Sequence, residues 1–117
     1  MIHSLGRVTI AASGTPILAT TNEAVPTQRY PCQTVFFQQI ESNTGKLYIC
    51  DRANAVIGTL AGVVAVIPAP TLVNQVATVL PWAQVSVPSA PAALDASKFW
   101  IDADNTNDAC LVSAVRN

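Results

Sequence analysis

The sequence is poor in charge. Only 11% of its 117 residues are Asp, Glu, Lys or Arg, where about 25% is typical of soluble domains. Six basic and seven acidic residues nearly cancel, and the formal net charge is −1. Because neither sign dominates, we expect no nucleic-acid partner and no anionic membrane surface as a partner.

The few charges are also spread unevenly. After Arg52 the next ionisable side chain is Asp95, so residues 53–94 carry no charge at all. A nearly neutral monomer with such a stretch would be poorly protected against self-association. Polar residues that would solvate the stretch are sparse, and large exposed apolar patches usually mark interfaces. We therefore expect much of this region to be covered by another subunit.

Long apolar runs are absent as well. A membrane-spanning helix needs about 20 apolar residues. The uncharged segment Ala55–Ile67 is shorter, and Pro68, Pro70 and Pro81 interrupt the chain after it. Residues 1–8 lack the apolar region of a signal peptide. We expect a chain made in the cytoplasm, not exported by that route and without a membrane partner.

Residues that carry chemistry are few. The one histidine, His3, lies near the N-terminus, where a catalytic base would be loosely held. Cys32, Cys50 and Cys110 make an odd count without CxxC spacing, which favours neither a zinc site nor a disulfide framework. The five glycines match no phosphate-binding loop. We expect no enzyme, no cofactor and no small-molecule substrate, and we expect reduced, buried thiols.

What the sequence does contain is period-two alternation of apolar and polar residues between turn residues, which is typical of short strands. No helical period is sustained, although residues 53–62 or 91–97 have room for a helical turn. We expect about eight short strands in a single domain over residues 1–117. The expected strands cover residues 7–12, 17–20, 32–41, 46–51, 63–67, 83–87, 98–102 and 110–115.

This pattern predicts an all-β fold, a two-sheet antiparallel β-sandwich, of which the jelly roll is one form. Residues 32–41 and 46–51 are predicted to pair as a hairpin around Ser42–Gly45. Gly45 would supply the positive φ that such a loop commonly requires. Residues 1–5 are expected to form an N-terminal arm that is mobile or contacts a partner.

Asp102, Asp104 and Asp108 form the most distinctive polar cluster. Asp at alternate positions is how loops that bind hard cations such as Ca²⁺ begin. Here, however, Asn107 stands where the EF-hand form has glycine, and Ser113 stands where it has glutamate. An Asp- and Asn-rich hairpin turn is the favoured interpretation, and a cation site is the weaker alternative.

The two tryptophans predict contact with a partner. Trp100 alternates with Phe99 and Ile101, which places it on the opposite face of its strand. Tryptophan is enriched at interface hot spots, although exposed aromatic rings also serve as stacking platforms for sugars or bases. The partner interface is predicted to include Trp82, Trp100, Phe36, Val63, Val64 and Val66.

Two segments carry a resemblance. Residues 36–51 read Phe-Phe-Gln-Gln-Ile-Glu-Ser-Asn-Thr-Gly-Lys-Leu-Tyr-Ile-Cys-Asp, and residues 99–114 read Phe-Trp-Ile-Asp-Ala-Asp-Asn-Thr-Asn-Asp-Ala-Cys-Leu-Val-Ser-Ala. Together they resemble small virion structural proteins of tailed bacteriophages, in particular the capsid decoration, or cement, class. The resemblance implies a β-sandwich on the virion surface, made in the host cytoplasm and bound to the major capsid protein. It implies no catalytic residues.

Two other functions stay open at this point. One is a carbohydrate- or receptor-binding module of a phage tail or fibre, with Trp82, Trp100 and the loop Asp102–Asp108 at its tip. The other is a tail-tube or head–tail connector subunit, which would form an oligomeric ring. In each structural role we expect the chain to form a homo-oligomer.

Overall fold

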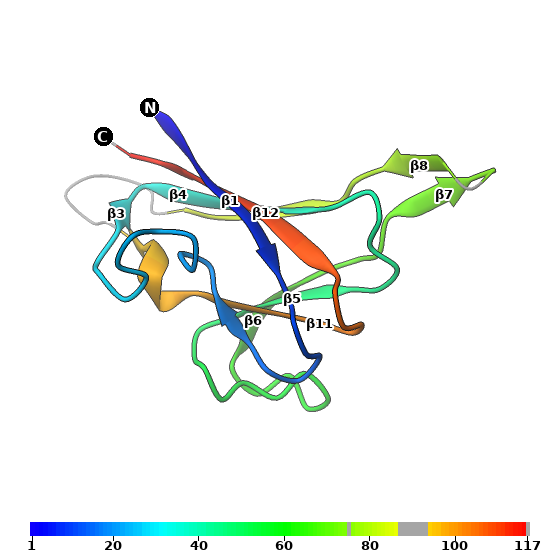
Figure 1. The fold of residues 1–117 in the computed structure, drawn as a ribbon, viewed down its shortest axis with the longest axis horizontal. Coiled ribbons are helices and arrows are strands. Elements are labelled where there is room, and N and C mark those ends of the chain that lie inside the picture. Colours follow the sequence, from blue (N-terminus) through cyan, green and yellow to red (C-terminus); the bar gives the residue numbers. More distant parts are fainter. Residues whose placement is uncertain (75, 87–93, 117) are drawn as a thin grey trace.

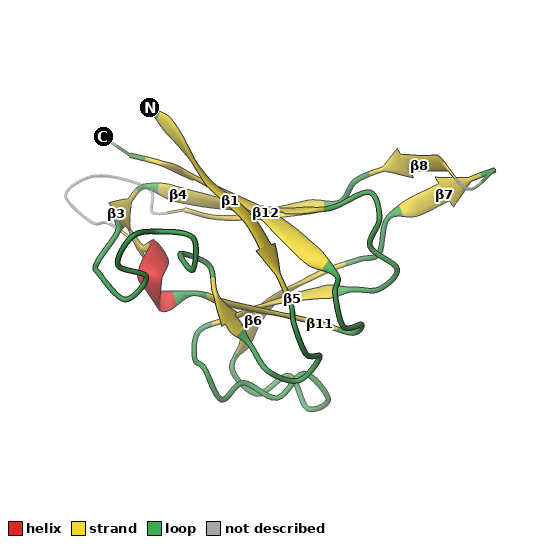
Figure 2. Cartoon of the chain, in the orientation of Figure 1, coloured by secondary structure: helices red, strands yellow, loops and turns green. Residues whose placement is uncertain are grey.

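The computed structural model describes residues 1–74, 76–86 and 94–116. Its strands build two four-stranded antiparallel sheets packed on one core (Figure 1). The predicted all-β, sandwich-like fold is therefore confirmed. Helical structure in this part of the chain is limited to one 3₁₀ turn (Figure 2).

The two sheets each draw strands from distant parts of the sequence. Sheet A has the order β1 (Ile2–Thr9), β12 (Ala109–Val115), β4 (Thr34–Gln39) and β9 (Trp82–Ser86). Sheet B has the order β2 (Ile17–Leu18), β11 (Trp100–Ala103), β5 (Leu47–Cys50) and β6 (Val63–Ile67). Two short pairs complete the structure, β3 (Pro31–Cys32) with β10 (Leu94–Asp95), and β7 (Thr71–Val73) with β8 (Val76–Val79).

The core lies between the sheets because alternate residues of each strand point inward. Val35 and Phe37 of sheet A and Ile49 and Ile101 of sheet B are completely buried. Phe37 also meets Phe99 edge to face, with ring centroids 5.9 Å apart. Each fully buried side chain of this size contributes about 1.5–3 kcal/mol relative to an exposed one, so these alternating positions hold the two sheets together.

The predicted hairpin between residues 32–41 and 46–51 is wrong. Strand β4 pairs with β12 and β9, whereas β5 pairs with β11 and β6. The segment between β4 and β5 therefore crosses from sheet A to sheet B. Val35 and Phe37 of β4 and Leu47 and Ile49 of β5 are buried in the same core, so the two strands face each other across it from opposing sheets.

Gly45 serves this crossing in a different way from the one predicted. Its φ is not positive; among the described glycines a positive φ occurs at Gly6, Gly14 and Gly62. A Cβ atom at Gly45 would instead lie 2.6 Å from Nδ2 of Asn105 and 2.9 Å from Cβ of Asp104. The position requires glycine because the loop 104–108 approaches the backbone there.

A buried pair of amides fixes the crossing. The Asn43 side chain donates to Oε1 of Gln39 and to the carbonyl of Ala109, both at 2.6 Å, and accepts from the Ala109 N–H at 2.8 Å. The Gln39 amide nitrogen donates to the carbonyls of Gly45 and Pro68, at 3.1 and 2.9 Å. Gln39 and Asn43 are 1% and 4% exposed, so water cannot replace these bonds.

The first five residues are not a free arm. Strand β1 begins at Ile2 and pairs with β12 up to Thr9, and the Met1 amino group donates to the Arg116 carbonyl at 2.8 Å. A β-bulge around Gly6, with φ +82°, keeps Leu5 directed into the core. Residues 2–5 are therefore part of a sheet and not a free arm, and their contact with a partner stays a prediction.

Of the two segments with room for a helical turn, the second overlaps the one that forms. The 3₁₀ turn covers Ala96–Lys98, and residues 91–93 of the predicted segment lie outside the described residues. Asp95 caps the turn by accepting from the Ser97 N–H and hydroxyl. Partial burial opposes ionisation of Asp95, but these bonds and one from the Tyr30 N–H outweigh it and lower the pKa of Asp95.

The amide pair gives a testable prediction. Replacing Asn43→Ala removes three hydrogen bonds and leaves Gln39 and Ala109 with unsatisfied buried groups, so the free energy of unfolding should fall by about 3 kcal/mol. Urea denaturation measures this difference. The control is Asn54→Ala in the exposed loop, where the change should stay within about 0.5 kcal/mol. Equal stability of the two variants would contradict the role of the amide pair.

Candidate assembly surface

The uncharged stretch supplies one edge strand to each of the two large sheets. Strand β6 is an edge of sheet B, β9 is an edge of sheet A, and the two contact each other. The hairpin β7–β8 connects them and projects from the end of the sandwich (Figure 1). We call β6, β9 and the hairpin β7–β8 between them the uncharged side.

Large apolar side chains lie exposed on the uncharged side. On β6, Val64 and Val66 are 52% and 41% exposed, and on the projecting hairpin Leu72 and Val73 are 56% and 53% exposed. Trp82, at the start of β9, is 60% exposed. An apolar surface of this kind, free of charge, is a candidate contact surface for protein.

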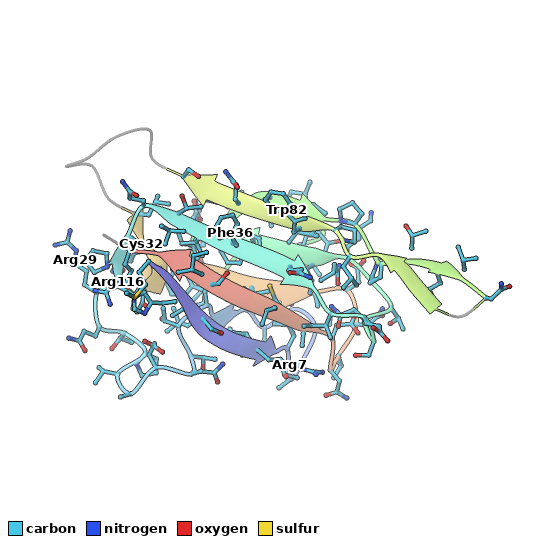
Figure 3. All side chains as sticks on the ribbon, turned by 90° about the horizontal axis from the view of Figure 1, so that it is seen from above. Arg7, Arg29, Cys32, Phe36, Trp82 and Arg116 are labelled. Carbon is cyan, nitrogen blue, oxygen red and sulfur yellow. The ribbon has the colours of Figure 1, made fainter. Side chains whose placement is uncertain are left out.

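The outer face of sheet A is also poor in charge. On this face the paired residues form three rows that run across β1, β12, β4 and β9. One of these rows consists of Arg7, Leu111, Gln38 and Trp82. Arg7 carries the one charge in these three rows. Phe36 lies next to Trp82, with ring centroids 6.1 Å apart (Figure 3). The predicted contact residues Phe36 and Trp82 thus lie together on the outer face of sheet A, whereas Val66, which pairs with Tyr48, and its neighbour Val64 lie on the outer side of sheet B.

Trp100 and Val63 have a different environment. Both pack against a second small cluster formed by Tyr48, Cys50 and Ala55 on the outer face of sheet B. The alternation along the strand correctly placed Trp100 on the face opposite Phe99 and Ile101. The loop after β5, however, packs Ala55 near that face, so Trp100 has neighbours from its own chain. Both residues are half-buried, so their predicted role in a partner interface stays a prediction.

The end of β11 and the loop after it use their carboxylates to bind backbone N–H groups. Oδ1 of Asp102 accepts from the Gly14 N–H at 3.0 Å, and the Asp102 side chain is completely buried. Oδ2 of Asp108 accepts from the N–H groups of Thr44 and Gly45, at 3.2 and 3.0 Å. These bonds tie the loop to two neighbouring segments.

Asp104 is engaged in the same way. Its Oδ1 accepts from the Tyr48 hydroxyl at 2.7 Å, and this hydrogen bond raises the pKa of Tyr48 to about 12. Among the described residues, no three His, Cys, Asp or Glu side chains are grouped as they would be around a metal ion. The geometry therefore favours the structural turn for Asp102, Asp104 and Asp108.

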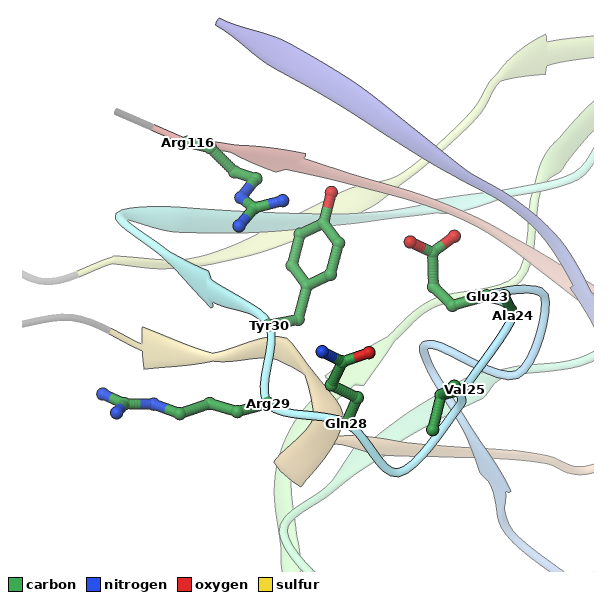
Figure 4. A pocket seen from close by; sticks show the side chains of 7 residues that line it. All are labelled: Glu23, Ala24, Val25, Gln28, Arg29, Tyr30 and Arg116. Atoms are coloured by element: carbon green, nitrogen blue, oxygen red, sulfur yellow. The ribbon is translucent and has the colours of Figure 1, made fainter.

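A small pocket lies at the opposite end from the projecting hairpin. It has a volume of about 230 Å³, and Tyr30, Arg116, Glu23 and Arg29 are among its lining residues (Figure 4). The Arg116 guanidinium lies 4.4 Å from the centre of the Tyr30 ring, in a cation–π contact. Arg29 extends away from that ring in Figure 4. The pocket mixes both signs of charge.

Sequence reasoning missed the projecting hairpin. Its strands lie between Pro70 and Pro81, which read as interruptions of an apolar run. The available signal was Asn74, which adopts φ +52° between the two strands, because asparagine tolerates a left-handed conformation at a tight turn. The one histidine, His3, lies in β1 opposite Ala114.

Comparisons with known proteins returned no match: no protein-family model, no curated protein and no solved structure is similar to this chain. None of the helices in the described part of the chain is long and apolar enough to cross a membrane.

The cysteines allow a test of this structure. All three are free and buried, and burial raises the pKa of Cys32, that of Cys50 to about 11 and that of Cys110 to about 12. We expect no thiol to react with a disulfide reagent at pH 8 in the native protein and all three to react in denaturant. Since the unfolded thiols ionise near pH 9.0, the folded state should lose stability above that pH. Rapid native labelling would contradict the burial.

Proposed function

We propose that this protein is a non-enzymatic virion structural protein of a tailed phage, a decoration or cement protein that binds the outer surface of the major capsid shell and stabilises it. The observation that carries the proposal is the uncharged side, where two edge strands and a projecting hairpin expose apolar side chains without one charge between them. The resemblance of residues 36–51 and 99–114 supplies the setting.

The physical properties of the uncharged side support this role. Covering exposed apolar area contributes about 25 cal/mol per Å², and the absence of charge removes the cost of desolvating ions. The hairpin β7–β8 extends the contact beyond the sandwich, so one chain can reach more than one shell subunit. Antiparallel sheets joined by cross-strand hydrogen bonds form a rigid body that transmits load between those subunits.

The arrangement gives less support to a sugar-binding module. Such a module would gather Trp82, Trp100 and the loop Asp102–Asp108 at one tip. Trp82 lies on the outer face of sheet A and Trp100 on the outer face of sheet B, with the core between them. A connector subunit has similar β content and is distinguished by its place and copy number in the particle.

Imaging tests the proposal directly. Electron cryo-microscopy of the phage whose genome encodes this chain should show the sandwich repeated over the outer capsid lattice, with the uncharged side against the shell. A single ring at the head–tail vertex would establish the connector function instead. Density confined to the tail tip, or no copy in the particle, would overturn the proposal.

A charge substitution tests the surface. Val64→Lys places a cation on the uncharged side, and binding to purified shells lacking this chain should weaken by about tenfold or more, because the ammonium group loses its hydration on contact. The matched control is Val25→Lys, since Val25 is equally exposed at 52% and lies outside the uncharged side. Sedimentation with the shells measures both. Equal binding of the two variants would exclude β6 from the contact.

A further inference from the structure

Three of the four edge strands of the two four-stranded sheets carry a feature that hinders pairing with another chain. Strand β1 has the bulge at Gly6 and the charged Arg7, β6 has a register shift opposite Ile49 and Cys50, and β2 is two residues long. Bulges, charges and short length are the usual protections of an edge strand. Strand β9 has none of them: it pairs with β4 over Trp82–Ser86 without a register shift and without a charge.

The main chain of β9 is directed so that it can accept another strand. The Gln39 N–H at the end of β4 donates to the Pro81 carbonyl at 3.0 Å. Antiparallel pairs alternate between bonded and non-bonded positions, so Ala83 and Val85 turn their backbone groups toward β4. Those of Trp82, Gln84 and Ser86 turn the other way, where the described residues provide no hydrogen-bonded strand.

We propose that β9 pairs with β9 of a second copy of this chain, antiparallel and about a two-fold axis at Gln84. The two copies of sheet A then become one continuous sheet. This register uses all three outward-facing residues of each strand. Gln84 lies opposite its own counterpart, and Trp82 lies opposite Ser86 of the other copy.

The side chains of β9 fit a second copy in both size and charge. On the outer face the largest residue, Trp82, meets the small Ser86, and on the inner face Ala83 meets Val85. Two identical uncharged strands approach each other without the repulsion that a charged edge would produce. Trp82 is also positioned in advance by its contact with Phe36, so little side-chain freedom is lost on pairing.

This inference deepens the self-association expected under the proposed function, because it names the strand that carries it. The two are tested separately. Pairing is measured on the isolated chain, whereas shell binding is measured with the particle, so either result can fail without the other.

Proline at Gln84 tests the main-chain contact. Gln84→Pro removes an N–H that points away from β4, and an edge strand tolerates proline at such a position. Sedimentation equilibrium at up to about 0.1 mM should show a dimer for the unmodified chain and at least tenfold weaker association for Gln84→Pro. Gln84→Ala keeps the N–H and should still dimerise. An unmodified chain that is monomeric throughout this range would overturn the proposal.

A disulfide test does not depend on how proline is tolerated. Two cysteines at the two-fold position of an antiparallel pair lie about 5.5 Å apart between Cα atoms, within disulfide reach. Gln84→Cys should therefore oxidise to a covalent dimer, while the native thiols are buried and do not compete. The control is Gln38→Cys, on the same face but on the inner strand β4. Equal oxidation rates for the two variants would overturn the proposed pairing.

Discussion

The structure depends on one buried polar contact, the pair of amides formed by Gln39 and Asn43 at the point where the chain leaves sheet A for sheet B. A loop that crosses a sandwich must satisfy its backbone groups without water. Here the two side chains bond Gly45, Pro68 and Ala109, so they join the crossing to the end of β6 and the start of β12. Because this junction fixes the positions of β4 and β5, it also fixes the edge strands β9 and β6 that pair with them.

The edges determine where the molecule can meet other proteins. With β12 and β4 inside sheet A and β11 and β5 inside sheet B, the uncharged residues of β6 and β9 are left at one side. The charged residues Asp102, Asp104 and Asp108 are instead used within the chain, where they bond backbone N–H groups or the Tyr48 hydroxyl. Charge thus stabilises the loops, and the surface left for contact is apolar.

The sequence could predict most strands of the two large sheets and the fold class because both depend on alternation, and Val35, Phe37, Ile49 and Ile101 point inward as their parity requires. It missed the short strands β3, β7, β8 and β10. Strand pairing could not be read in this way. The alternation of β4 and β5 would be the same whether they paired as a hairpin or lay in opposite sheets. The contacts that decide between the two come from Ala109 and Asp108, more than sixty residues away from Asn43 and Gly45. Trp82 and Phe36 were predicted as surface residues individually, but their contact depends on the pairing of β4 with β9.

An unprotected edge strand can cause aggregation unless another strand pairs with it. The symmetry of that pairing decides whether the assembly is closed or grows without limit. If β9 of one copy added to a different edge of the next, each addition would leave a new edge and the chains would grow into a fibre. The bulge in β6 and the brevity of β2 oppose such additions. Pairing β9 with itself consumes both open edges in one step and leaves β1, with its bulge and Arg7, at each end of the joined sheet. The same features that protect three edges therefore favour a closed dimer over an open chain of subunits.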